Sequence, residues 1–177
     1  YDGYGFGIKK VMEQQAVTSG IIGAVADIIK VEEKYETAIE TALGGSIQNI
    51  VTDTQKTAKK MIEYLKKNRY GRVTFLPLDA VKGKEFARKE ILLEPGVIGA
   101  ANQLVIYDEV YKDLFASLLG QILVVKDMDA GIKIANKYHH SVRIVTLDGD
   151  SLNRGGAMSG GAFKNKSNLL GRSREVE

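Results

Sequence analysis

The feature that most constrains this chain is an order of strands and helices that occurs twice. In each half, short β-branched segments typical of buried strands alternate with segments whose apolar residues recur at helical spacing. The first half predicts a strand at 21–31, a helix at 32–43, a strand at 47–52, a helix at 55–68 and a strand at 72–78. The second half predicts a helix at 107–119, a strand at 122–126, a helix at 129–138 and a strand at 143–147. This alternation favours a mixed α/β fold.

Individual residues recur in step with this pattern. Tyr35 and Tyr111 are 76 residues apart, and Leu43 and Leu119, each followed by glycine, have the same separation. The remaining matches are Asp53 with Asp127, Ala58 with Ala130, Arg72 with Arg143, and Asp79 with Asp150. We therefore predict two related α/β lobes, 1–79 (with an N-terminal helix) and 103–163, joined by an ordered connection at 80–102 and followed by an exit segment at 164–177. Coincidental recurrence of common strand and helix patterns is the alternative interpretation.

Composition narrows the class of protein. With 44% hydrophobic and 27% charged residues, the chain resembles an ordinary globular domain. The lack of cysteine excludes disulfides, thiolate nucleophiles and zinc–thiolate sites. No apolar run approaches the roughly 20 residues of a membrane helix, and no signal-peptide pattern opens the chain. Because the first residue is not Met, we expect a segment of a longer protein. The net charge of +3 alone does not indicate a nucleic-acid partner.

No constellation of residues predicts catalysis. The pairs Asp127/Asp129 and Asp148/Asp150 offer too few oxygens for a hard cation, and they are typical of helix caps and turns. The only histidines, His139 and His140, are adjacent near a predicted helix C-terminus, where positive charge is favourable. We therefore predict no catalytic residue, no metal site and no cofactor.

A glycine-rich run at 149–161 is the most unusual segment. Glycine permits positive φ angles and the close approach of another backbone. A turn-rich loop is the simplest interpretation, and a cradle for phosphate is an alternative. The glycines at 3, 5 and 7 lack the preceding strand that a dinucleotide loop needs, and no P-loop motif is present.

Basic residues are concentrated in two segments. Between residues 56 and 72 there are seven basic side chains and one acid, and between 164 and 174 there are four basic side chains and no acid. A solvated helix face is the simple interpretation of the first segment. The second suits sequence-independent contact with phosphates. The candidate DNA-binding residues are Lys164, Lys166, Arg172 and Arg174 and, on the predicted helix, Lys59, Lys60, Lys66 and Lys67.

Taken together, these segments resemble a known family. The stretches 23–31, 35–45, 71–79 and 143–150 are similar to the hinge domain of SMC chromosome-maintenance proteins of the prokaryotic type. Gly149, Gly156, Gly160 and Gly161 reproduce the glycine spacing of that family. The resemblance covers residues 3–161, and the segment at 167–177 is similar to the family's return into its coiled coil.

The resemblance implies a dimerisation module. Hinges of this family have two α/β lobes per chain, and edge strands of opposite lobes pair to make a ring-shaped dimer. It further implies that the four glycines lie at the dimer interface, because glycine lets strands approach across it. A homodimer is the simplest assembly.

The resemblance also implies a cellular role. The domain would link coiled-coil arms for chromosome condensation and segregation, in the cytoplasm at the nucleoid. It would bind DNA weakly without sequence preference and would contact no membrane. The ATPase of the family lies in head domains that this chain lacks, so we expect no enzyme activity. The alternative is a nucleotide- or phosphate-binding α/β domain that uses the loop at 149–161.

Overall fold

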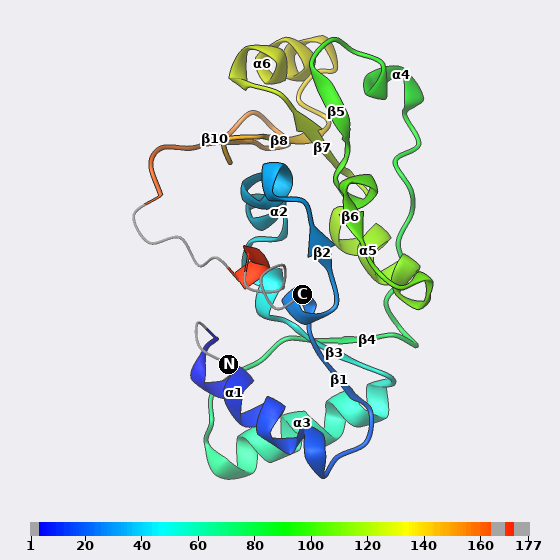
Figure 1. The fold of residues 1–177 in the computed structure, drawn as a ribbon, viewed down its shortest axis with the longest axis vertical. Coiled ribbons are helices and arrows are strands. Elements are labelled where there is room, and N and C mark those ends of the chain that lie inside the picture. Colours follow the sequence, from blue (N-terminus) through cyan, green and yellow to red (C-terminus); the bar gives the residue numbers. More distant parts are fainter. Residues whose placement is uncertain (1–3, 164–168, 172–177) are drawn as a thin grey trace.

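The computed structural model describes residues 4–163 and 169–171. The chain forms an elongated body with a lobe at each end of its long axis (Figure 1). Each lobe combines helices with its own sheet, so the predicted mixed α/β fold is confirmed. No helix in the described ranges has both the length and the apolar character needed to cross a membrane.

The first lobe is built on a three-stranded sheet in the order β1-β3-β4. Its elements are α1 (Phe6–Glu13), β1 (Ile21–Ala24), β3 (Ile50–Thr52), α3 (Gln55–Asn68) and β4 (Phe75–Pro77). Helix α3 begins where the Thr54 hydroxyl accepts a hydrogen bond from the Thr57 N–H at 3.3 Å, and it ends at Arg69 in the left-handed conformation. A hydroxyl N-cap and a left-handed residue at the C-cap are common boundaries of α-helices.

The second lobe contains a five-stranded sheet in the order β10-β9-β8-β7-β5. Its elements are α4 (Lys89–Leu92), β5 (Val97–Ala100), β7 (Ile122–Val125), α6 (Met128–Lys137), β8 (Arg143–Thr146), β9 (Ser151–Leu152) and β10 (Met158–Ser159). Between the lobes lie β2 (Lys30–Val31), α2 (Glu36–Leu43), β6 (Val105–Ile106) and α5 (Lys112–Leu119). Short 3₁₀ turns η1 to η6 link these elements at Gln14–Ala16, Val25–Asp27, Glu33–Tyr35, Gly44–Gln48, Ala101–Leu104 and Glu109–Tyr111.

The two lobes repeat one topology. β1 pairs antiparallel with β3, and β3 pairs parallel with β4; β5, β7 and β8 have the same arrangement. Even an irregularity recurs, because the β1–β3 register shifts at Gly23 and the β5–β7 register shifts at Gly99. The prediction of two related lobes is therefore confirmed in strand order and direction.

A short strand pair relates the lobes to each other. β2 and β6 occupy equivalent places in the two lobes, and they pair antiparallel with Lys30 opposite Ile106. Because equivalent residues face each other in an antiparallel pair, the lobes are related by an approximate two-fold axis through this pair. The equivalent helices α2 and α5 also contact each other.

Three apolar cores follow from this arrangement. A central core draws on both lobes and includes Ile39, Phe115, Leu169 and Leu170. A second core lies within the second lobe between α6 and its sheet, and a third lies within the first lobe beneath α1 and α3. The lobes therefore share one core and each retain one of their own.

The structure corrects three details of the predicted boundaries. The strand predicted at 21–31 is divided into β1 and β2, which join different sheets, because the chain turns through Val25–Asp27 with the Asp27 carboxylate accepting from the Ala24 N–H. The predicted connection at 80–102 contains β5, the edge strand of the second sheet. The sheet register places Phe75 opposite Ile50 and Ile144 opposite Leu123, so Asp79 corresponds to Asp148 and not to Asp150.

Candidate dimer interface

The glycine run folds into a hairpin that extends the second sheet. At its start, Gly149 adopts φ 91° in the turn between β8 and β9. The Thr146 N–H donates to the Asp150 carbonyl at 2.9 Å and the Asp150 N–H donates to the Thr146 hydroxyl at 3.1 Å. This tight turn sends β9 back along β8 and places β10 at the outer edge of the sheet.

Backbone N–H groups of the hairpin turn donate hydrogen bonds within the chain. Asn153 N–H donates to the Ala157 carbonyl, Gly156 N–H donates to the Asn153 carbonyl, and Gly155 N–H donates to the His140 carbonyl at 3.0 Å. A phosphate cradle needs several neighbouring N–H groups that point at the ligand. These three N–H groups are engaged within the chain and do not point at a ligand.

β10 presents an open edge. The Asn153–Ala157 bond closes the hairpin, so the Met158–Leu152 pair is the non-hydrogen-bonded kind and Met158 directs its N–H and C=O away from β9. Met158 is 54% exposed.

The four predicted interface glycines have different places. Gly149 and Gly156 lie in turns, and a Cβ atom at Gly149 would lie 2.7 Å from the Phe163 ring. Gly160 and Gly161 follow β10 directly. A Cβ atom at Gly160 would overlap the Asp150 carboxylate, whereas Gly161 has φ 127° and open space around it. The structure brings only the last two to the open edge.

β4 is the corresponding open edge in the first lobe. The Ile50 N–H donates to the Thr74 carbonyl at 3.0 Å and the Leu78 N–H donates to the Thr52 carbonyl at 2.9 Å. Alternate residues of a parallel strand bond to the same neighbour, so Phe75 directs its N–H and C=O away from β3. Pro77 has no N–H, and its carbonyl accepts from Ala80 and Val81. The free hydrogen-bonding groups of this edge are therefore concentrated at Phe75.

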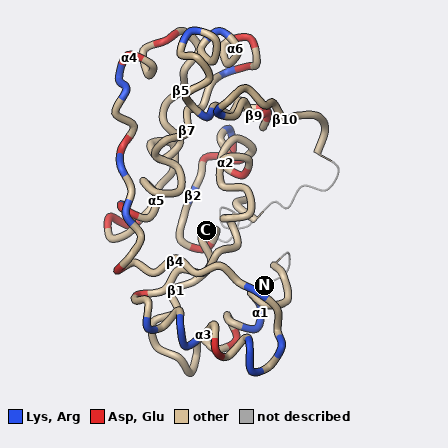
Figure 2. Tube along the Cα trace, turned by 180° about the vertical axis from the view of Figure 1, so that it is seen from behind, with Lys and Arg blue, Asp and Glu red and all other residues tan. Residues whose placement is uncertain are grey.

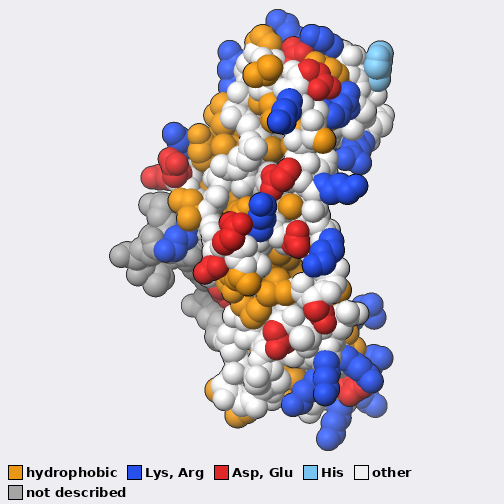
Figure 3. All heavy atoms as spheres, turned by 90° about the vertical axis from the view of Figure 1, so that its right-hand side faces the viewer, with side chains coloured by type: hydrophobic (Ala, Val, Ile, Leu, Met, Phe, Trp, Pro, Cys, Tyr) orange, Lys and Arg blue, Asp and Glu red, His pale blue; other side chains and the backbone are white. Residues whose placement is uncertain are grey.

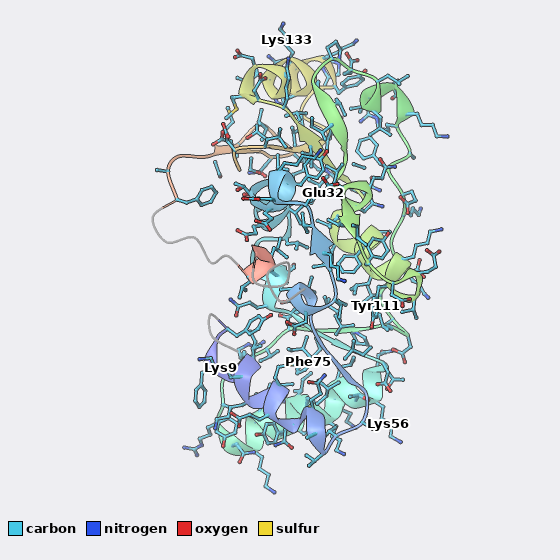
Figure 4. All side chains as sticks on the ribbon, in the orientation of Figure 1. Lys9, Glu32, Lys56, Phe75, Tyr111 and Lys133 are labelled. Carbon is cyan, nitrogen blue, oxygen red and sulfur yellow. The ribbon has the colours of Figure 1, made fainter. Side chains whose placement is uncertain are left out.

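A groove of about 670 Å³ runs between the β4 edge and α3. Its apolar floor includes Ile62, which is 40% exposed, together with Phe75 and Pro77. The rest of its lining is Gln55, Lys56, Ala58, Lys59, Glu63 and Lys66. Figure 4 labels Phe75 on β4 and Lys56 on α3, which both line the groove. The sequence analysis did not find this groove; the only signal was Pro77, which is typical of an edge strand.

The four α3 lysines predicted to contact DNA lie on two different sides of the helix. Lys59, Lys60, Lys66 and Lys67 are all exposed. Lys59 and Lys66 line the groove, whereas Lys60 and Lys67 lie about 100° further round the helix, away from it. Lys and Arg positions are frequent along the trace at this end of the molecule (Figure 2), and their side chains gather on its surface (Figure 3). Lys164, Lys166, Arg172 and Arg174 lie outside the described residues.

Local hydrogen bonds lower the pKa values of two carboxyl groups. The Thr57 hydroxyl and the Thr54 N–H hold the pKa of Asp53 below its usual value. The Lys137 ammonium, 2.8 Å from Glu94, and the Tyr138 hydroxyl lower the pKa of Glu94. Among the described residues no cluster of three or more His, Asp or Glu side chains is arranged to hold a metal ion.

Comparison with known proteins identifies the arrangement. Residues 18–135 match the family model described as SMC proteins Flexible Hinge Domain. The chain is 44% identical to the chromosome partition protein Smc of Desulfitobacterium hafniense over 99% of its own length, and 43% identical to that of Bacillus subtilis over 100%. It spans about 15% of the length of each of these curated relatives.

Solved structures agree with the sequence matches. A structure reported as an asymmetric dimer of the Geobacillus stearothermophilus SMC hinge domain has a TM-score of 0.92 and 44% identity, covering 99% of this chain and 72% of that one. The Pyrococcus furiosus SMC hinge domain has a TM-score of 0.76 and 32% identity, covering 92% of this chain and 83% of that one.

Proposed function

The chain belongs to the SMC flexible hinge family, and on this premise we propose that it dimerises by pairing β10 of one copy with β4 of the other. The observation that carries the proposal is that β10 in the second lobe and β4 in the first each direct backbone hydrogen-bonding groups outward from an edge of their sheet. Each copy contributes one edge of each kind. Two copies related by a two-fold axis therefore close a ring with two equivalent contacts and leave no edge of either kind unpaired.

The chemistry of the two edges supports this pairing. Met158 on β10 and Phe75 on β4 each direct an N–H and a C=O outward, so the strands can exchange main-chain hydrogen bonds. The groove beside β4 exposes Ile62, and the side chain of Met158 is half exposed. Strand pairing would bury this apolar surface, which favours association.

Glycine suits the strand that enters such a contact. Gly160 and Gly161 come directly after β10, and they have no side chain to hold a neighbouring strand away. Gly149 and Gly156 support the same contact indirectly, because their turns aim the hairpin. All four glycines therefore serve the proposed interface, two by contact and two by shaping β10.

In the whole protein, the proposed role is to join two coiled-coil arms at the end distant from the ATPase heads. This would serve chromosome condensation and segregation, at the nucleoid in the cytoplasm. The hinge itself would carry no catalytic step and hold no cofactor. Its proposed DNA contact is weak and independent of sequence, with Kd roughly 10⁻⁴ to 10⁻⁶ M at physiological salt.

Met158→Pro tests the strand pairing. Proline removes the outward N–H of β10 and leaves the β9–β10 ladder intact, because Met158 does not bond to β9. Two lost hydrogen bonds per dimer should cost about 3 kcal/mol, which raises the dimer Kd about 100-fold in sedimentation equilibrium. Met158→Leu is the matched control, since it keeps the N–H, and it should remain dimeric. An unchanged Kd for Met158→Pro would contradict the pairing, and a parent that is a monomer would contradict dimerisation itself.

The DNA contact needs a separate test. Charge reversal of Lys164 and Lys166 to Glu should leave the dimer mass unchanged and abolish the mobility shift of a short DNA duplex at low salt. If that variant binds as well as the parent, the tail is not the contact. Reversal of Lys60 and Lys67 then examines the exposed face of α3.

A further inference from the structure

Three aromatic rings lie in a row where α1 meets the end of α3. Phe6 and Tyr70 meet edge to face with ring centroids 5.6 Å apart and planes at 78°, and Tyr64 and Tyr70 meet at the same distance with planes at 65°. Phe6 is 61% exposed. This aromatic row (Phe6, Tyr70 and Tyr64) thus begins at the surface with one largely solvated ring.

The row is held in place by neighbouring polar groups. The Lys10 ammonium lies 5.4 Å from the Phe6 centroid and 5.0 Å from the Tyr70 centroid. The Gln14 amide donates to the Tyr64 hydroxyl at 3.4 Å. Ring positions fixed in the free protein lower the entropic cost of binding a flat ligand.

Positive charge surrounds the row. α1 contributes Lys9 and Lys10, α3 contributes Lys60 and Lys67, and Arg69 follows at the C-cap of α3. Figure 4 labels Lys9 on α1, at the same end of the molecule. The carboxylate of the nearby Glu13 lies 3.6 Å from the Lys10 ammonium, and this ammonium offsets the negative charge of Glu13. Lys60 and Lys67 do not line the groove beside β4, so the proposed dimer would leave them accessible.

We propose that the aromatic row is a stacking platform for unpaired nucleic-acid bases, with the surrounding lysines and Arg69 contacting the phosphates. This rests on the proposed function and deepens it by naming the form of the ligand at this end. A base can stack on an exposed ring only when it is not already stacked within a duplex. Aromatic rings among basic side chains are the combination that binds single strands with little dependence on sequence.

The platform has no counterpart in the second lobe. The residue equivalent to Phe6 by the 76-residue separation is Lys82, which lies in the connection and forms a salt bridge with Asp113 at 3.5 Å. Each chain therefore carries one platform, at its first-lobe end.

The experiment compares a labelled oligothymidylate of about 16 nucleotides with a duplex of the same length, both at low salt, on the 177-residue chain. Phe6→Leu keeps an apolar side chain and removes the ring. It should weaken single-strand binding about 10-fold and leave duplex binding unchanged. Phe6→Trp restores a ring and introduces the only tryptophan of the chain, so its fluorescence should be quenched by the single strand and not by the duplex.

The outcomes separate this inference from the proposed function. If Phe6→Leu binds the single strand as tightly as the parent, or loses duplex binding equally, the platform is wrong while DNA binding stands. Unquenched Phe6→Trp fluorescence on a bound single strand also overturns the platform. If the parent binds neither probe, both the platform and the proposed DNA contact fail, while the dimer proposal is unaffected.

Discussion

The two lobes share a strand topology, but the second sheet continues for two more strands. In the first lobe, β4 is the last strand of its sheet and its outer edge stays open. In the second lobe, the equivalent strand β8 is covered by β9, and β10 becomes the open edge instead. The repeated part, including a bulge at Gly23 and at Gly99, builds the fold. The unrepeated part, the glycine hairpin, supplies one of the two strands that the proposed dimer joins.

This contrast makes equivalent positions natural pairs for mutation. A change that has the same effect in both lobes reports on the shared architecture. A change that differs between them reports on what one lobe has added. A higher protein concentration favours the proposed dimer and raises its apparent stability. All comparisons below therefore require the same protein concentration.

The largest effect is expected in the central core. Ile39 and Phe115 are equivalent residues, both with 0% exposure in the core that the lobes share. Ile39→Ala and Phe115→Ala should each lower the free energy of unfolding by about 4 kcal/mol. Urea unfolding followed by circular dichroism should show a single transition in both variants. Two separated transitions would show that the lobes unfold independently and would break the comparison.

The bulge glycines should respond unequally. Gly23 has φ 149°, which disfavours any side chain, whereas Gly99 has an ordinary negative-φ backbone and its nearest neighbour to a Cβ is 3.6 Å away. Gly23→Ala should cost about 2 kcal/mol, or about 4 to 8 °C in melting temperature. Gly99→Ala should be neutral or stabilise by less than about 1 kcal/mol. Equal losses in thermal melts would mean that the two bulges are equally strained.

The helix caps form a third pair. Thr54 caps α3 through Thr57 N–H at 3.3 Å, and Asp127 caps α6 through Ala130 N–H at 2.9 Å. Each alanine variant should cost about 1 kcal/mol, with Asp127→Ala the more costly because its charge also favours the helix N-terminus. Asp127→Asn keeps the cap without the charge and should recover most of the loss. Failure of that recovery in thermal melts would assign the effect to charge alone.

The smallest effect concerns acid pH. Glu94, whose pKa is lowered by Lys137 and Tyr138, fastens the end of the connection to α6, whereas the equivalent residue of the first lobe is the neutral Thr18. The stabilisation by Glu94 is present above its ordinary pKa of about 4.3 and is lost as pH falls through its lowered value. The melting temperature of the parent should therefore fall slightly more between pH 6 and pH 3 than that of Glu94→Gln. Identical pH profiles of the parent and the variant would show that the Glu94 contacts do not contribute to stability.

The sequence predicted the long elements well and the short ones poorly. The helix predicted at 55–68 has the observed bounds, because both its cap and its apolar stripe are local signals. β2 and β6 have two residues each, which is too short for any periodicity. β5 was assigned to the connection because its residues Val97–Ala100 follow the turn residues Pro95 and Gly96, and only its pairing with β7 makes it a strand.

The candidate site shows the same limit. The spacing of the glycines located the hairpin, but not which of them reach the open edge; that depends on the alternation set by the Asn153–Ala157 bond. The β4 groove joins residues more than ten positions apart, so no local pattern marks it. The sequence analysis matched Arg72 with Arg143 because the residues are identical, whereas the sheet register makes Phe75, opposite Ile50, the equivalent of Ile144, opposite Leu123.

The chain ends have a mechanical consequence. Leu169 and Leu170 are buried in the central core, and Tyr4 packs against the same core with its hydroxyl donating to Asp27 at 2.8 Å. A force applied through both ends would thus enter the molecule at the joint between the lobes, and neither lobe would be pulled by itself. The load would then pass from the shared core into both sheets, whose outer strands include β4 and β10. The core that joins the lobes would therefore carry the tension between the two chain ends, and both proposed dimer edges would be loaded together.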